Sequence, residues 1–334
     1  MPPSSSTSSS SEFAKLGRRG LVLLALVVLL DQGLGRLAQV LYDRTRDGDT
    51  GETINALLER PHDIVIFGSS RAESHYIPSI LRDATGASVY NAGFKGSNIV
   101  YDYGLEQLLL DHYVPKLIIY DFSSFSVQRS TADPYEKLYP LYPFWRNAHV
   151  WSLISEGGLR ARIPFLSRLY PYSSKIHSLL IFNLIGHRAD AEDGYNGNTA
   201  VMPDGPVGPL RVAREDYDPR LTSYLAEFVE AAHRSGAALV FVESPRRARG
   251  SFPLPDGIAA LLGKYGFPVI DFDDARFPES TDHRFFRDPS HLNDRGAKIF
   301  SRAVGEQVAT LYPDLASRVG GPRSSDPSPQ VGGR

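Results

Sequence analysis

Short, uninterrupted apolar segments recur along the chain and predict buried β-strands. They cover residues 64–67, 88–90, 117–120, 239–242 and 269–270. Apolar runs without polar alternation are typical of strands that are covered on both faces. Segments with helical spacing of apolar residues lie between them. This alternation of strand and helix predicts an α/β domain with a parallel sheet of about five strands.

Three helices are indicated by apolar residues at helical spacing. The first ends before Pro115, because proline disfavours helix in the residue before it. The second opens with Asp218 as its cap and Pro219 in the first helical position. The last has Asn293 available as a cap and carries Leu292 on its apolar face.

One long segment breaks the alternation. Residues 123–216 separate the third predicted strand from the fourth and are too long for an ordinary loop. We therefore expect an insertion in the α/β domain that covers its functional site. Aromatic residues alternate with prolines over residues 134–145, a composition suited to a lid or to a wall on which a ligand stacks. The same aromatic residues are equally suited to form a small core of the insertion itself.

The N-terminal region combines a polar leader with an apolar segment. Residues 1–20 are rich in serine, end with basic residues and are predicted to be a disordered leader. Apolar residues fill positions 21–30 and resume after Asp31, so residues 21–42 are predicted to be an uncleaved transmembrane signal anchor. A helix of that length extends about 33 Å, which crosses a bilayer. The alternative is a buried N-terminal helix of a soluble protein.

The charges around this span predict its orientation. Basic residues precede the span, which places the rest of the chain on the extracytoplasmic side. Asp31 opposes insertion by about 3 kcal/mol, whereas the leucine and valine residues favour it by about 4 to 8 kcal/mol. Residues 43–60 are expected to link the span to a globular domain at 61–318. Residues 319–334, rich in Gly, Pro and Ser, are expected to form a disordered tail.

Composition and charge exclude several classes of function. The 334 residues are 42% hydrophobic and 22% charged, as in globular proteins. Lys and Arg total 36 against 38 Asp and Glu, so no basic field attracts nucleic acid. The absence of cysteine removes disulfides, thiolate metal sites and cysteine nucleophiles. The histidines are not spaced as metal ligands, and we expect neither a metal nor a cofactor.

Candidate chemistry lies where the predicted strands end, because open parallel sheets bind ligands beyond the carboxyl ends of their strands. Ser70 follows the first strand at a turn into a helix, and Gly68 relieves crowding there. Asp288 and His291 follow the fifth strand. Serine attack on an ester needs a base and an acid that orients the base. We therefore predict Ser70 as nucleophile, His291 as base and Asp288 as the orienting acid.

Residues near the other strand ends complete the predicted site. The backbone N–H groups of Ser70 and Gly93 are the predicted oxyanion donors. Asp121 either supports the turn at Ser70 or only ends its strand. Structural alternatives exist, since serine caps helices, arginine forms solvated ion pairs, and a Gly-Ser turn before a helix also binds phosphate. The candidate substrate-binding residues are Arg71, Asn98, Ser123 and Arg246.

Three blocks, at residues 68–70, 91–93 and 288–293, resemble the SGNH (GDSL-like) hydrolases and follow the order of that family. The resemblance implies a flavodoxin-like three-layer α/β/α fold and esterase chemistry without a cofactor. Ser69 stands where many members have aspartate. The family's third block usually supplies an oxyanion asparagine, but residues 121–124 contain none. Asn98, Ser123 or Ser124 would have to replace it, or the activity would be weak.

The Gly-Ser-Ser form and the N-terminal anchor are most similar to the membrane-tethered branch of the family, whose members acylate or deacylate teichoic acids and exported polysaccharides. The resemblance implies a single-pass, extracytoplasmic acyl ester hydrolase or O-acyltransferase that acts on O-acylated cell-envelope or secreted glycan. Envelope polysaccharide assembly proteins are the implied partners. The alternative is a catalytically silent, membrane-anchored glycan-binding or assembly protein with the same fold.

Overall fold

The computed structural model describes most of the chain. The first part of the predicted leader, residues 1–6, and the predicted tail, residues 319–334, lie outside the described residues. The described residues are 7–46, 48, 53–186, 192–209, 213, 216–273 and 275–315.

Five parallel strands form the central sheet, which confirms the prediction from the apolar segments. Counted along the chain, the sheet strands lie in the order 2-1-3-4-5, which is the flavodoxin-like order. In spatial order they are β2 (Val89–Asn91), β1 (Ile64–Gly68), β3 (Leu117–Asp121), β5 (Ala238–Glu243) and β7 (Val269–Asp271).

Helices cover both faces of this sheet and produce three layers. Val65 and Phe67 of β1 belong to the apolar core under one helical layer, and Ile64 and Ile66 belong to the core under the other. This division follows from the alternation of side chains along a strand. The first layer contains α5 (Ile99–His112), α9 (Pro219–Ser235) and α10 (Ile258–Tyr265); the second contains α3 (Ser70–His75), α4 (Pro78–Thr85) and α11 (Asp294–Leu311).

Side-chain caps fix where the long helices begin. The Asp218 side chain accepts a hydrogen bond from Arg220 N–H at the start of α9, as predicted. Asn293 likewise caps α11, so Leu292 precedes this helix and does not lie on its face. Leu292 belongs instead to a small antiparallel hairpin that follows two 3₁₀ turns. These elements are η6 (Pro278–Thr281), η7 (His283–Phe285), β8 (Phe286–Asp288) and β9 (His291–Leu292).

The insertion, residues 123–216, is mainly helical. Its aromatic residues pack on one another: the ring of Phe165 lies 5.1 Å from that of Tyr142 and 5.9 Å from that of Trp145. These contacts show that the aromatic residues pack as core, and this core is continuous with the apolar core of the domain on the α5 side of the sheet. Its elements are η1 (Ser124–Ser126), η2 (Pro134–Phe144), α6 (Ala148–Glu156), α7 (Gly158–Arg162), η3 (Ile163–Leu166), η4 (Tyr170–Lys175), α8 (Ile176–Ile185) and β4 (Gly208–Pro209), which pairs with β6 (Ala248–Arg249).

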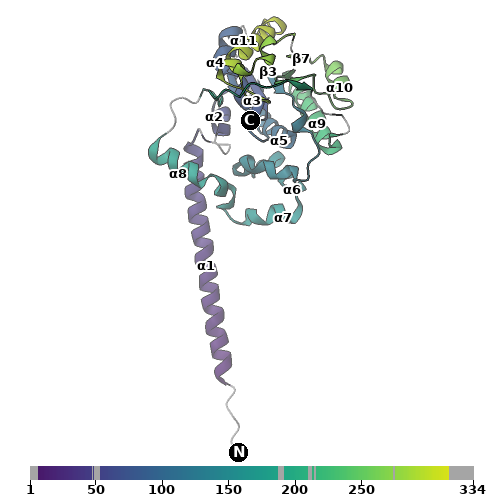
Figure 1. The fold of residues 1–334 in the computed structure, drawn as a ribbon. Coiled ribbons are helices and arrows are strands. Elements are labelled where there is room, and N and C mark those ends of the chain that lie inside the picture. Colours follow the sequence, from purple (N-terminus) through teal and green to yellow (C-terminus); the bar gives the residue numbers. More distant parts are fainter. Residues whose placement is uncertain are drawn as a thin grey trace, which may run out of the picture.

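A single long helix, α1 (Thr7–Arg44), extends from one end of the domain (Figure 1). Residues Glu12–Arg44 are long and apolar enough to cross a membrane. The helix begins inside the region predicted to be a disordered leader. The physical reason is that extending an existing helix needs no new nucleation, so polar residues continue a helix that the apolar residues establish.

The predicted linker also contains regular structure. Residues Thr53–Glu59 form α2, and the side chains of Ile54 and Leu57 are buried in the core of the domain. Ile54 and Leu57 are three positions apart, so they lie on the same face of the helix. Burial of this face holds the short helix against the core. The polar composition of the residues before Thr53 concealed this signal.

Candidate active site

The turn between β1 and α3 places Ser70 at the carboxyl end of the sheet. Ser70 is the first residue of α3 and follows Gly68 by two positions. Gly68 has φ of +135°, and a Cβ atom at this position would lie 2.9 Å from the carbonyl oxygen of Asp121. Glycine is therefore required for the chain to leave β1 so closely beside β3 and turn into the helix.

The structure brings Ser70, His291 and Asp288 together. The Ser70 Oγ atom lies 2.7 Å from His291 Nε2. On the other side of the ring, His291 Nδ1 lies 2.9 Å from each carboxylate oxygen of Asp288. These distances are within hydrogen-bond reach for a nucleophile, a base and an orienting acid. With the proton on Nδ1 held by Asp288, Nε2 is the atom that accepts a proton from Ser70.

The loop between β8 and β9 positions the acid and the base. Asp288 Oδ1 accepts hydrogen bonds from the backbone N–H groups of Ser290, at 2.9 Å, and His291, at 3.1 Å. This arrangement is an Asx turn, in which the aspartate side chain fixes the backbone two and three residues ahead. Partial burial opposes the charge of Asp288, but these hydrogen bonds and His291 leave its pKa below the ordinary value.

Burial lowers the pKa of His291 below its usual 6.5, although the hydrogen bond and charge of Asp288 act in the opposite direction. The imidazole is therefore neutral at neutral pH. A neutral imidazole has a free lone pair on Nε2 and can accept the proton of Ser70. Burial thus keeps the base in the form that nucleophilic attack requires.

A buried polar network lies behind the nucleophile and is centred on Asp121, the last residue of β3. Its carboxylate accepts hydrogen bonds from the Tyr76 hydroxyl at 3.0 Å, from Ser244 N–H at 3.1 Å and from the Ser244 hydroxyl at 3.2 Å. The guanidinium of Arg71 lies 3.5 Å from the same carboxylate. Asp121 therefore connects the ends of β3 and β5 to α3, which carries Ser70.

His75 links this network to the loop that carries the base. Its Nε2 atom accepts a hydrogen bond from Leu292 N–H at 2.9 Å, so the ring proton is on Nδ1, which donates to Ser244 Oγ at 3.0 Å. Full burial keeps the pKa of His75 well below 6.5, so the ring is neutral. The residue after His291 is thereby fixed to the helix that starts at Ser70.

Ser244 and Tyr76 are residues of this network that sequence reasoning missed, and Ser244 makes more connections than Tyr76. It follows β5 directly, and that position at a strand end is the signal that could have identified it. Its hydroxyl accepts from Arg71 Nε at 3.1 Å and from His75, and it donates to Asp121. One hydroxyl thus joins three buried polar side chains, and we assign it a positioning role.

The two predicted substrate-binding arginines are buried and have partners within the protein. Arg71 is buried, and its guanidinium binds Ser244 and the carbonyl oxygen of Phe122. Arg246 is also buried, forms an ion pair with Glu243 and stacks on the ring of Phe252 at 3.9 Å. Buried guanidinium groups need such partners, and these contacts hold the scaffold of the site.

Asn98 and Ser123 act as helix caps. Asn98 Oδ1 accepts from Val100 N–H at 3.1 Å, while its Nδ2 donates to the carbonyl oxygen of Pro134 at 3.0 Å. The Ser123 hydroxyl accepts from Phe125 N–H at the start of η1. Asn98 also lines a cavity of about 320 Å³ between the loops that follow β2 and β3. The amide of Asn98 is therefore engaged within the protein in this conformation.

Gly93, the second predicted oxyanion donor, lies against the nucleophile's helix. A Cβ atom at this position would lie 2.4 Å from Glu73 N, so only glycine allows this approach. The N–H group of Gly93 donates to Asn91 Oδ1 at 3.0 Å. Asn91 in turn donates to the carbonyl oxygens of Ala72 and Tyr76 at 2.8 and 2.9 Å. The Gly93 amide thus already has an acceptor, whereas Ser70 N–H, at the first helical position, has none within α3.

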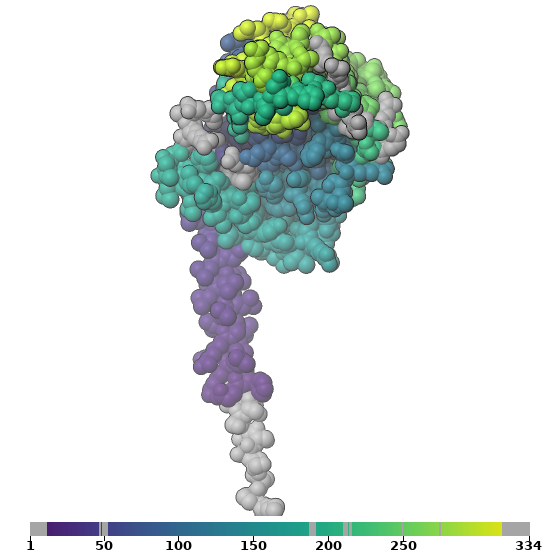
Figure 2. All heavy atoms as spheres, in the orientation of Figure 1, coloured from purple at the N-terminus to yellow at the C-terminus, as the bar shows by residue number. Residues whose placement is uncertain are grey.

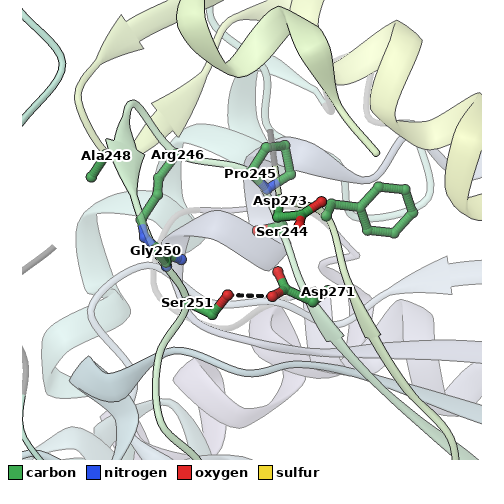
Figure 3. A pocket seen from close by; sticks show the side chains of 9 residues that line it. Ser244, Pro245, Arg246, Ala248, Gly250, Ser251, Asp271 and Asp273 are labelled. Atoms are coloured by element: carbon green, nitrogen blue, oxygen red, sulfur yellow. Dashed lines mark hydrogen bonds between the residues drawn. The ribbon is translucent and has the colours of Figure 1, made fainter. Parts of the chain in front are cut away.

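A second cavity, of about 210 Å³, opens beyond the ends of β5 and β7 (Figure 3). Ser244 and Arg246 line one side of it, and Asp271 and Asp273 contribute carboxylates. The Ser251 hydroxyl donates a hydrogen bond to the carboxylate of Asp271 (Figure 3). Within the described ranges no group of three or more His, Asp or Glu side chains is arranged to hold a metal ion.

Comparisons with known proteins do not show a family for this chain. No family model matches the chain, and no curated protein matches it. Among solved structures, the chain is similar to a crystal structure described as a "putative acylhydrolase" from Bacteroides fragilis. The identity is 13% and the TM-score is 0.36, over 78% of this chain and 94% of the other.

Proposed function

We propose that this chain is a serine-dependent acyl ester hydrolase or O-acyltransferase of the SGNH type. The observation that carries the proposal is the continuous hydrogen-bonded series from Ser70 through His291 to Asp288. Each of the three side chains has a structural alternative when taken alone. Their joint geometry at the carboxyl edge of a parallel sheet is what nucleophilic acyl transfer requires.

In the proposed reaction the Ser70 oxygen attacks the ester carbonyl carbon while His291 Nε2 takes its proton. Asp288 stabilises the imidazolium that forms. The tetrahedral intermediate then expels the alcohol, which receives the proton from His291, and an acyl-serine remains. Water or a sugar hydroxyl attacks this acyl group with His291 again as base. The products are a carboxylic acid or a new ester, and Ser70 recovers its proton.

The oxyanion in this reaction would be held by backbone N–H groups of Ser70 and Gly93. The N–H of Ser70 lies at the N-terminus of α3, where helix geometry leaves it without an intrahelical acceptor. Gly93 would exchange its hydrogen bond with Asn91 for one with the oxyanion. Because an oxyanion is a stronger acceptor than an amide oxygen, this exchange is favourable when negative charge develops.

The substrate class that we propose is O-acylated cell-envelope or secreted glycan. A membrane-spanning α1 with basic residues before its apolar segment supports an extracytoplasmic site. The 320 Å³ cavity supports a polyol substrate, since it combines the exposed ring of Phe125 with polar groups such as Lys137 and Asn98. Envelope polysaccharide assembly proteins are the corresponding partners.

A second candidate function is a catalytically silent glycan-binding or assembly protein. It is favoured by one observation: the amides of Gly93 and Asn98 both have acceptors within the protein. Loss of one oxyanion donor lowers kcat by about 10²-fold to 10³-fold. A site in which neither amide becomes available would bind an acylated glycan and turn it over very slowly.

The two candidates are separated by measuring ester turnover. The full-length chain in detergent micelles would be given a chromogenic aryl acetate and, in parallel, an O-acetylated polysaccharide. An enzyme releases acetate or transfers the acetyl group, and Ser70→Ala abolishes both reactions. The matched control Ser223→Ala, at an exposed serine of α9, keeps them. Binding of the polysaccharide without turnover by the unmodified chain would favour the silent protein.

A further inference from the structure

A set of large apolar side chains is exposed on the insertion. We call it the apolar rim. Its members come from the consecutive elements α7 and η3 and from α8, and three of them are at least 80% exposed. A soluble surface usually exposes such residues singly, whereas here they form two close groups along the chain, one in α7 and η3 and one in α8. Groups of this kind mark interaction sites. The apolar rim consists of Leu159, Ile163, Leu166, Leu180, Leu184 and Ile185.

The turn that follows η3 and helix α8 both pack on α1. The carboxylate of Asp31 accepts hydrogen bonds from the Ser167 hydroxyl and from the N–H group of Arg168, the latter at 2.8 Å. One turn later, a Cβ atom on Gly35 would lie 2.7 Å from the backbone of Arg168. Glycine therefore allows the turn between η3 and η4 to touch the helix backbone.

Contacts continue along α1 toward its C-terminal end. Tyr42 of α1 is buried in a small apolar core with Tyr172 of η4 and Leu179 of α8. Asn183 of α8 donates to the carbonyl oxygen of Leu41 and to the Thr45 hydroxyl. The insertion thus holds α1 from Asp31 to Thr45 by both polar and apolar contacts.

This docked length of α1 overlaps the length that a bilayer requires. The hydrocarbon core is about 30 Å thick, which corresponds to about 20 helical residues. Arg19 is the last basic residue before the apolar segment, so a span that starts there ends near Gln39. Asp31 lies about 18 Å along the helix from Arg19. The contacts of the insertion with Asp31 and Gly35 therefore lie at the depth of the hydrocarbon.

The carboxylate of Asp31 has the hydrogen-bond partners that a charged group in the hydrocarbon region requires. A carboxylate within a bilayer is expensive unless it is paired or hydrogen-bonded. The hydroxyl of Ser167 and the N–H groups of Arg168 and Leu169 supply such hydrogen bonds from the insertion. Arg160 and Arg162 alternate with apolar residues beside the apolar rim, and long cationic side chains reach from such positions to lipid headgroups.

We propose that the apolar rim lies within the lipid bilayer beside α1, at the level of the outer leaflet. The chain is then held by a transmembrane helix and by a monotopic surface of the insertion together. Figure 1 shows α7 and α8 at the end of the domain from which α1 projects, and Figure 2 shows the insertion forming that end. This inference rests on α1 and the insertion and is independent of the catalytic role proposed for Ser70.

The depth of the rim can be measured by site-directed labelling, because the chain has no cysteine and each introduced cysteine is unique. The full-length chain carrying Leu166→Cys or Ile185→Cys would be labelled with an environment-sensitive fluorophore. It would then be placed in vesicles of phosphatidylcholine and phosphatidylglycerol. Leu24→Cys, within α1, serves as the reference for the membrane interior. Ala259→Cys, at an exposed position of α10 remote from α1 (Figure 1), serves as the reference for water.

Lipids that carry a nitroxide on the acyl chain quench only fluorophores within the bilayer. We expect the labels at Leu166 and Ile185 to be quenched by lipid nitroxides near the headgroup, and the label at Ala259 by none. Quenching at Leu166 and Ile185 as weak as at Ala259 would overturn the proposal. Protection from aqueous iodide without lipid quenching would also overturn it, in favour of a protein partner on the apolar rim.

Discussion

The candidate site has two halves that differ in their readiness for catalysis. In the proton-transfer half, Ser70, His291 and Asp288 are already joined at 2.7 and 2.9 Å, and the base is held in its neutral form. In the oxyanion half, the amides of Gly93 and Asn98 donate to acceptors within the protein. The first half is complete in the free chain, and the second would be completed only by substrate.

This difference has a physical origin in what supports each half. The nucleophile and base are fixed by a buried network through Asp121, Ser244 and His75, and groups buried in this way have no alternative solvent partners. Gly93 and Asn98 lie in the loop that follows β2, where a donor finds a local acceptor: the N–H of Gly93 donates to Asn91 and the amide of Asn98 to Pro134. Acyl transfer would therefore require the Gly93 N–H group to exchange its hydrogen bond with Asn91 for one with the oxyanion.

The proton-transfer half makes the strongest prediction. Replacing Asp288 by asparagine leaves the shape of the loop but removes the carboxylate that fixes the proton on His291 Nδ1. We expect kcat on an aryl acetate to fall by about 10⁴-fold, as for a triad with the wrong imidazole tautomer. Asp83→Asn, at an exposed aspartate of α4, is the matched control and keeps its rate. A fall below about tenfold would remove Asp288 from the mechanism.

The pH dependence of kcat/KM also tests the proton-transfer half of the site. His291 has to be neutral to accept a proton, and burial lowers its pKa below 6.5. We expect kcat/KM to be constant at neutral pH and to fall about tenfold per unit once the pH drops below that pKa. In Asp288→Asn this acid limb should move to still lower pH, because Asp288 raises the pKa of His291. An acid limb centred above pH 6.5 would contradict the assignment.

Removing the Ser244 hydroxyl tests whether the buried polar network holds Ser70 and His291 in place. Ser244→Ala leaves Arg71, His75 and Asp121 each without one buried hydrogen bond. We expect the free energy of unfolding in urea to fall by about 1 to 3 kcal/mol. Displacement of α3 should also lower kcat by on the order of tenfold to a hundredfold. A loss of stability with unchanged kcat would reduce Ser244 to a folding role, and Ser223→Ala should change neither quantity.

The smallest effect is expected in the oxyanion half. Asn98→Ala removes a helix cap and should lower the free energy of unfolding by about 1 kcal/mol. Because the Asn98 amide is bound to Pro134, we expect kcat on a small aryl ester to stay unchanged. A fall in kcat of about 10²-fold to 10³-fold would mean that Asn98 turns to donate to the oxyanion when substrate binds. Asn98 would then join Gly93 as a donor that becomes available only when substrate binds.

The sheet was predictable from the sequence because buried parallel strands are continuous apolar runs. The segments around Ile64, Leu117 and Leu239 each became a strand at the predicted place. The short helix at Thr53–Glu59 was missed because its two buried side chains lie in a polar context. The predicted boundary between a disordered leader and the apolar helix was wrong, because α1 begins at Thr7. The composition of the leader alone does not show that a helix formed by the following residues extends into it.

The candidate site was predictable only in part. Ser70 lies at the carboxyl end of a sheet strand, where the sites of parallel sheets form. Asp288 and His291 lie in the β8–β9 hairpin, and the strand pattern does not give the place of this hairpin beside Ser70. Partnerships inside the site depend on side-chain directions, which no spacing encodes. The sequence around a strand-end arginine such as Arg246 does not show whether its side chain faces solvent or packs, as it does here, on Glu243 and Phe252. The same limit concealed Ser244, whose role arises from three residues distant in the chain.

The measurement that tests the central claim most directly is covalent capture of the nucleophile. The full-length chain would be incubated with a fluorophosphonate, and the modified residue would be located by mass spectrometry of its peptides. We predict a single adduct on Ser70 that is lost in His291→Ala, because the base must take the serine proton. An intact chain that forms no adduct, or forms it equally well without His291, would contradict the account.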